Sequence, residues 1–152
     1  NTNEFYNPVP EGFVFDHLLA KYFINPVSMM YTNIMLESLE GYDESLSYED
    51  FDLWVRSSKK FKYCYSNEYL VSKRRTKGSH GAGQYKFGSP HLKSTFLVCQ
   101  KALALCESTK ELDSLIIRIN YEMKRAFLSL NLNISIEFLK LKKIEFLTLL
   151  LF

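Results

Sequence analysis

The chain has 152 residues, of which 47% are hydrophobic and 24% charged, and its formal net charge is +2. These values are typical of one globular domain with a single core, and they exclude a globally disordered chain. The three cysteines (Cys64, Cys99 and Cys106) are odd in number and lack a CxxC spacing. They argue against a disulfide framework and favour a reducing interior.

The N-terminal segment 1–28 holds three of the four prolines and is expected to be an irregular arm. A short helix over residues 15–23 is predicted within it, packed on its own domain. The apolar segment 29–37 that follows is interpreted as a first strand, with alternate side chains on one side. Gly41 and the two residues after it end that strand.

A helix is predicted over residues 48–60. Ser47 and Asp50 have the spacing of a capping box, and Lys59 and Lys60 suit the negative end of the helix dipole. Trp54 lies on the apolar face of this helix and is expected in the core.

The next segment is unusually basic, because residues 69–106 contain seven Lys/Arg and no Asp or Glu. The rest of the chain is therefore net acidic. Residues 61–73 and 84–87 are predicted as two strands of a hairpin finger spanning about 69–93, with a glycine-rich tip. Its positive potential suits a polyanion, and the expected RNA-binding residues are Lys73, Arg74, Arg75, Lys77, His80, Lys86, His91 and Lys93. Tyr85, Phe87 and His91 are candidates to stack on unpaired bases; His91 has an alternative structural role after the proline turn.

Residues 95–106 fit either a helix or a buried strand. Ser108 and Glu111 form a second capping box, followed by an apolar stripe of helical period up to Phe127. Residues 132–138 alternate apolar and polar side chains, which favours a half-buried strand.

The predicted order is strand, helix, strand, basic hairpin, strand, helix, strand. This order indicates an α+β fold, a ferredoxin-like β-α-β-β-α-β sandwich with a long basic β-hairpin extension. The expected division is an N-terminal arm (1–28), the α+β domain (29–141) and a C-terminal tail (142–152). The apolar run 144–152 is far shorter than the roughly 20 residues of a membrane span.

One tripeptide, Ser89-Pro90-His91, directly follows the predicted hairpin, and the alternating run 133–140 comes about fifty residues later. In this arrangement the chain resembles the small-subunit ribosomal protein S-10 family over roughly residues 30–141. The resemblance implies a structural protein in the head of the small ribosomal subunit, whose finger binds rRNA beside neighbouring head proteins. The extensions favour a mitochondrial member, with a cytoplasmic or plastid ribosome as the alternative. Neither a membrane nor a small-molecule substrate is expected as a partner.

The same residues bear on three other functions: a DNA-binding regulator, an enzyme and a metal-binding protein. A small DNA-binding regulator of viral or phage type is the alternative, because such proteins also join a basic hairpin to helices. An enzyme acting on a phosphorylated substrate is disfavoured, since residues 69–106 supply no carboxylate as a base or metal ligand. No Walker A or GxGxxG motif is present. Cys99, Cys106, His80 and His91 fit no familiar zinc spacing, so no cofactor or metal is expected and the thiols are interpreted as free.

Overall fold

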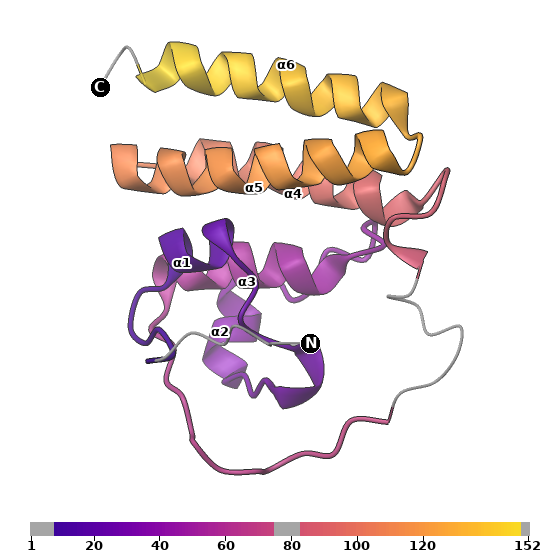
Figure 1. Cartoon of the computed structure of the whole chain (residues 1–152). Helices are drawn as coiled ribbons and strands as arrows, with labels where there is room; N and C mark the ends of the chain where they lie inside the picture. The colour runs from indigo at the N-terminus through magenta and orange to yellow at the C-terminus, as the bar shows by residue number, and fades with distance from the viewer. Residues whose placement is uncertain (1–7, 75–82, 150–152) are drawn as a thin grey trace.

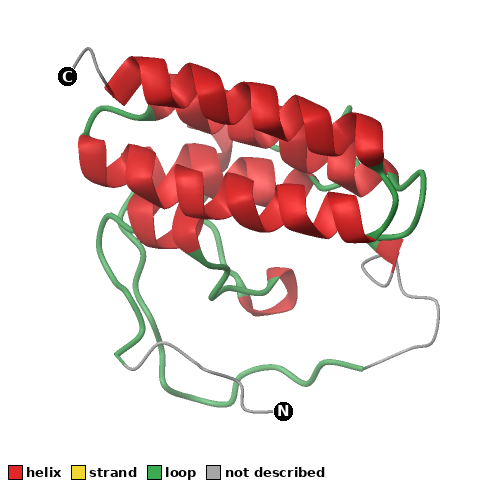
Figure 2. Ribbon diagram, turned by 45° about the horizontal axis from the view of Figure 1, so that its top comes forward, coloured by secondary structure: helices red, strands yellow, loops and turns green. Residues whose placement is uncertain are grey.

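The computed structural model describes residues 8–74 and 83–149, and the side chains of residues 8–74 and 83–143. The described part of the chain is helical and contains no sheet (Figure 2). Its one β feature is an isolated antiparallel bridge between Gly12 and Tyr63. The predicted ferredoxin-like α+β sandwich with a β-hairpin is therefore wrong, and the fold is all-α.

The elements and their bounds are α1 (Phe15–Ala20), η1 (Pro26–Ser28), α2 (Asn33–Ser38), α3 (Glu49–Lys60), α4 (Pro90–Leu105), α5 (Thr109–Leu128) and α6 (Leu132–Leu149). The helices predicted over 15–23, over 48–60 and after Ser108 are confirmed as α1, α3 and α5. The strands predicted over 29–37 and 132–138 are wrong, since α2 and α6 lie there. The described residues of 61–73 and 84–87 form no ladder, and the ambiguous segment 95–106 lies mostly in α4.

The prediction of a strand over 132–138 is wrong because the alternation of apolar and polar residues there is short. The same segment also has residues at helical spacing that can be buried on one face. Among the described side chains of α6, residues 132–143, those buried are Ser135, Phe138 and Leu141, which are three residues apart and share one helical face. The Ser135 hydroxyl donates to the carbonyl of Met123 on α5, so even the polar member of this face is satisfied.

The tripeptide Ser89-Pro90-His91 begins α4. Pro90 is the first helical residue, a position where the missing N–H removes no hydrogen bond and the fixed φ suits a helix. Gly88 has a φ of +72°, in the left-handed region that favours glycine. The tripeptide is thus a helix start, whereas the family resemblance implied a turn that ends a hairpin and enters a strand.

The helices pack in layers around one core (Figure 1). The long helices α5 and α6 pair along their length, and α4 contacts both of them and also α3. α1 packs on α3 and α5, so the N-terminal segment contributes to the core. The fully buried side chains of this core include Leu18, Leu19, Phe51, Trp54, Val98, Leu115, Ile119 and Phe138. Burial of Trp54 confirms its predicted role.

Arg118 on α5 fixes α1 in place. Its guanidinium donates to the carbonyls of Leu18 and Leu19 at 3.4 and 3.0 Å. Those carbonyls belong to the last turn of α1, where a helix has no intrahelical donors of its own. The same guanidinium lies over the Tyr22 ring, 3.6 Å from its centroid, and pairs with Glu122 at 3.3 Å. Burial of both charged side chains is therefore matched by hydrogen bonds.

Two helices end in the same kind of turn. After α5, the Asn131 amide donates to the carbonyl of Ala126 and the Leu130 amide to that of Phe127, with φ of +60° at Leu130. After α2, the turn at Glu40 has the same bonding pattern and a φ of +57°. Both are Schellman motifs in which a residue other than glycine occupies the left-handed position.

Candidate nucleic-acid interface

The segment between α3 and α4, residues 61–89, is called the connector below. Its described first part, residues 61–74, runs away from the helical layers, and its described last part, residues 83–89, leads into α4 (Figure 1). Its N-terminal end is fixed by Tyr63, whose backbone exchanges two hydrogen bonds with Gly12 at 2.7 and 2.8 Å. The Tyr63 hydroxyl lies 2.7 Å from Ser57 Oγ, and the Tyr65 amide donates to Glu11 Oε1 at 2.6 Å.

The C-terminal end of the connector is fixed to α5 and to the turn before α6. The Tyr85 hydroxyl donates to Glu122 Oε2 at 3.1 Å, and the Arg125 guanidinium lies 4.4 Å from the Tyr85 ring centroid. Asn131 donates to the Lys86 carbonyl at 3.1 Å and accepts from the Gly88 amide at 2.8 Å. Burial raises the pKa of Tyr85 and of Glu122, so the phenol remains a donor at neutral pH.

The described stretch between these two ends is open to solvent, because every residue from 64 to 74 is exposed. Lys73 and Arg74 lie here, and the Lys73 ammonium contacts Asn25 Oδ1 at 3.3 Å. Lys86 and Lys93 are exposed on the other side of the connector. These four side chains are the predicted RNA-binding cations that the structure places at the surface.

The remaining predicted site residues are placed differently. His91 is only 7% exposed, and its ring meets Tyr48 edge-on with centroids 6.5 Å apart. It lies within the packing between α3 and α4, where a base cannot reach it. Arg75, Lys77 and His80 lie outside the described residues.

The connector cations differ from many of those of the helical body in their partners. None of the ion pairs among the described residues involves Lys73, Arg74, Lys86 or Lys93. In the described helical body, six cations pair with carboxylates: Arg56, Lys59, Lys101, Lys110, Arg118 and Lys140. The exposed Lys60, Lys124, Arg125 and Lys143 are, like the connector cations, in none of the ion pairs among the described residues. The exposed cations of the connector, with Lys93 at the start of α4, are thus available for contact with a polyanion.

Sequence reasoning missed two features of the connector. Tyr85 was predicted to stack on a base, but its hydroxyl donates a hydrogen bond to Glu122. Glu122 is 37 positions away in the sequence, so no local pattern could predict this contact. Tyr69 was missed although it is fully exposed and lies four residues before Lys73. The mixture of aromatic and basic residues over 61–74 could have indicated an exposed aromatic side chain. The segment was instead predicted to be a strand, so Tyr69 was not considered.

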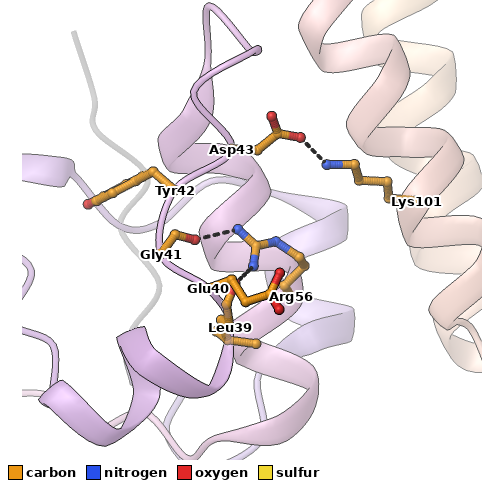
Figure 3. A pocket seen from close by; sticks show the side chains of 7 residues that line it. All are labelled: Leu39, Glu40, Gly41, Tyr42, Asp43, Arg56 and Lys101. Carbon is orange, nitrogen blue, oxygen red and sulfur yellow. Dashed lines mark hydrogen bonds and ion pairs between the residues drawn. The ribbon is translucent and has the colours of Figure 1, made fainter.

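A second feature is a surface hollow of about 320 Å³ beside the turn that follows α2 (Figure 3). Its lining residues are Leu39, Glu40, Gly41, Tyr42, Asp43, Arg56 and Lys101. The Arg56 guanidinium donates to the Leu39 and Gly41 carbonyls at 2.6 and 2.8 Å. This arginine thus closes the end of α2 in the same way that Arg118 closes α1.

The charges around the hollow neutralise one another. The buried carboxylate of Asp52 accepts from Arg56 Nε at 2.7 Å and from Lys101 Nζ at 2.8 Å. Lys101 also donates to Asp43 at 2.7 Å, and this contact, with that of Ser45, lowers the pKa of Asp43 to about 2. Both cations are engaged with carboxylates or carbonyls, and these contacts join α2, α3 and α4 around the hollow.

Other chemistry finds little support in the described part of the chain. No group of three or more His, Cys, Asp or Glu side chains is close enough there to hold a metal ion. Cys64 is exposed and Cys99 is buried, and no disulfide joins any of the three cysteines, all of which lie among the described residues. Among the described helices, none is both long and apolar enough to cross a membrane.

Comparison of the chain with protein-family models, curated proteins and solved structures found no match. The likeness to the ribosomal family therefore rests on the sequence features alone, and the fold that it implied is not the one observed. Any function must be argued from the geometry of this chain.

Proposed function

We propose that the chain is a non-enzymatic RNA-binding protein that contacts the sugar–phosphate backbone through its connector. The observation that supports this proposal is the set of exposed connector cations outside any ion pair of the described residues. Lys73 and Arg74 follow one another on an exposed stretch, and Lys86 and Lys93 flank the start of α4. Lysine and arginine that neutralise phosphates release counterions, which supplies most of the sequence-independent affinity for nucleic acid.

The helical body suits the part of a scaffold. Its charged groups are engaged with one another, as at Asp52 and Arg118, and both ends of the connector are hydrogen-bonded to it. A long segment held at both ends loses less conformational freedom on binding than a free tail does, so less of the contact energy is spent on ordering it.

Binding is tested by fluorescence anisotropy with a labelled RNA hairpin over a series of salt concentrations. The variant Lys73→Ala/Arg74→Ala should weaken binding and reduce the slope of log K against log salt by about 1 for each contact removed. The control Lys110→Ala/Lys140→Ala removes the same charge from ion-paired positions of the helical body and should leave the slope unchanged. Equal losses in the two variants would contradict a local contact and indicate a general charge effect.

The ribosomal setting stays a prediction of the sequence resemblance. It requires the protein to sediment with the small ribosomal subunit and to remain there in moderate salt, and recovery only in the soluble fraction would contradict it. The alternative, a DNA-binding regulator, requires tighter binding to duplex DNA than to RNA at equal salt, and a dimer that occupies two half-sites. The same anisotropy series with duplex DNA separates the two functions.

A further inference from the structure

Large apolar side chains are exposed where α5 turns into α6. Phe127 and Leu128, in the last turn of α5, are 61% and 63% exposed, and Leu130 in the turn itself is 69% exposed. Leu132, the first residue of α6, is 49% exposed. Single exposed apolar residues are ordinary, but a group of them on one part of a surface marks a site of contact with a protein or a membrane.

Asn131 brings a fifth apolar side chain, Phe87, to this turn. The Asn131 side chain donates to the Lys86 carbonyl at 3.1 Å and accepts from the Gly88 amide at 2.8 Å, so the backbone on both sides of Phe87 is held beside the turn. The Phe87 ring itself is 79% exposed. Figure 1 shows that residues 83–89 and the turn between α5 and α6 lie at the same end of the helices. This group is called the apolar end below and consists of Phe87, Phe127, Leu128, Leu130 and Leu132.

The stability of the fold does not account for Leu130. Its φ of +60° is in the left-handed region, which costs energy for an L-residue and none for glycine. A side chain that is 69% exposed adds little buried surface in return. A strained backbone position with an exposed apolar side chain points to a contact outside the chain.

The charges of the apolar end have one sign. Its two segments, residues 83–89 and 123–136, contain no Asp or Glu. Their cations are Lys86, Lys124 and Arg125, which are exposed and take part in none of the ion pairs found among the described residues. Lys124 and Arg125 lie about one helical turn before Leu128. The apolar end therefore suits a partner that offers both negative charge and an apolar interior.

We propose that the apolar end binds the surface of a bilayer that contains anionic phospholipids. The five apolar side chains enter the boundary between head groups and acyl chains, and Lys86, Lys124 and Arg125 contact lipid phosphates. Phenylalanine and leucine beside lysine and arginine are typical of protein surfaces that lie on membranes, and anionic lipids attract such cations. This site goes beyond the proposed function, and it differs from the expectation from sequence that a membrane is no partner.

Three other partners fit the apolar end less well. A second copy of the chain, related by a two-fold axis, would place the same surface on both sides and bring like charges together without a carboxylate in either segment. RNA has no use for leucine, because bases stack on aromatic rings. Interfaces with other proteins are depleted of lysine.

The test is co-sedimentation of the full chain with vesicles of phosphatidylcholine, alone or mixed with phosphatidylserine. The parent should bind the mixed vesicles more tightly. Leu130→Gly and Phe87→Ala should each weaken this binding about tenfold, because one large apolar side chain no longer leaves water. Leu130→Gly should do so while the chain becomes more stable to urea, so loss of the fold cannot explain the result. Lys124→Ala should weaken binding to the mixed vesicles about fivefold.

Two control variants carry the same kinds of change elsewhere. Met30→Ala removes an apolar side chain that is 91% exposed just before α2, away from α5 and α6 (Figure 1). Lys60→Ala removes an exposed lysine at the end of α3 that is in none of the ion pairs among the described residues. Neither variant should change binding to the vesicles, whereas losses equal to those of Leu130→Gly and Lys124→Ala would overturn the proposal.

Insertion has its own measurement. Phe87→Trp adds an indole at an exposed position, while the native Trp54 is buried. On addition of mixed vesicles its fluorescence should shift to shorter wavelength, and lipids brominated on the acyl chains should quench it. Unchanged emission from a vesicle-bound chain would refute insertion of this side chain and with it the proposed site.

The outcomes separate this inference from the proposed function. Leu130→Gly should bind the RNA hairpin as the parent does, and Lys73→Ala/Arg74→Ala should bind vesicles as the parent does. A chain that binds the RNA hairpin but no vesicles refutes this inference alone, and the opposite result refutes the proposed function alone. If Lys73→Ala/Arg74→Ala loses the vesicles while Leu130→Gly keeps them, the connector charge attracts the lipid and the apolar end is not the site.

Discussion

Arg118 is expected to be the most sensitive single position for the stability of the fold. Its guanidinium is almost fully buried and holds two carbonyls of α1, the Tyr22 ring and the buried carboxylate of Glu122. The variant Arg118→Leu keeps an apolar side chain of similar volume but removes every one of these polar contacts. It leaves Glu122 buried without its cation and the last turn of α1 without its donor.

The expected loss follows from these contacts. Removing one partner of a buried ion pair costs about 3–5 kcal/mol, because the other charge remains uncompensated. A domain of this size has a free energy of unfolding of about 5–15 kcal/mol, so a large part of it would be lost. The double variant Arg118→Leu/Glu122→Leu removes both charges and should recover part of the loss, since an apolar pair carries no desolvation penalty. Urea unfolding followed by circular dichroism measures the parent, both single variants and the double variant.

The pH dependence of the free energy of unfolding is a second test of the contact between Arg118 and Glu122. Burial raises the pKa of Glu122 in the folded chain, and Arg118 acts against this rise. Without Arg118 the folded-state pKa rises further above the unfolded value. A raised folded-state pKa gives a stability that is fully present below the unfolded pKa and lost as pH rises through the folded pKa. The Arg118→Leu variant should therefore be least destabilised in mild acid and most destabilised at neutral pH. A loss below about 1 kcal/mol at neutral pH, or a loss independent of pH, would refute this account.

Three further predictions concern turns and hydrogen bonds. Leu130→Gly should raise the free energy of unfolding by about 0.5–1 kcal/mol, because glycine adopts the left-handed conformation without the strain of an L-residue; a lower melting temperature would contradict this. Tyr85→Phe should cost about 1.5–3 kcal/mol in urea unfolding, because it removes a donor to the buried carboxylate of Glu122; an unchanged midpoint would show that this contact contributes nothing. Lys101→Met should raise the pKa of Asp43 from about 2 towards its ordinary value of 3.8, as followed by NMR titration, and no change would mean that Ser45 alone holds it low.

The helices that could be predicted are those with local signals. The N-cap predicted at Ser108 is confirmed, since its hydroxyl accepts from the Glu111 amide at 3.3 Å, while the Glu111 carboxylate accepts from the Glu107 amide at 2.7 Å. Helix α3 was predicted almost to its ends, although Ser47 does not cap it and instead donates its amide to Ser94 Oγ. Acidic residues in its first turn and lysines in its last made the helix recognisable without that cap.

The fold class could not be predicted because it depended on short apolar segments that fit a strand as well as a helix. Residues 132–138 alternate like a strand for seven positions, and only their continuation as one helix through Leu149 distinguishes the alternatives. The predicted strand 29–37 was similar, since Met30 and Ile34, assigned to one side of that strand, are both exposed and Ile34 lies in α2. These wrong strands, together with the two predicted hairpin arms, produced an element order that matched a familiar α+β topology, so the local errors led to the wrong fold class.

The candidate interface was predicted in part for a related reason. Its cations lie in one stretch of the sequence without acidic residues, so charge counting located Lys73, Arg74, Lys86 and Lys93. The partners that fix its ends, Glu122 and Asn131 for one and Gly12 for the other, are distant in the sequence and become visible only in three dimensions. His91 was predicted to contact RNA because it is close to the basic residues in the sequence. In the structure it is buried and packs against Tyr48.

The anchoring of the connector at both ends has a consequence for how the chain tolerates change. Helices α1 and α3 precede the connector and α4 to α6 follow it, yet both groups contribute to one core. A cut within the exposed residues 66–74 would therefore yield two fragments that share one core, because α1 packs on α5 and α3 on α4 across the cut. They should stay associated after proteolysis. By the same argument the length and composition of this segment can vary widely while the helices keep their packing, so ligand preference can change without loss of the fold.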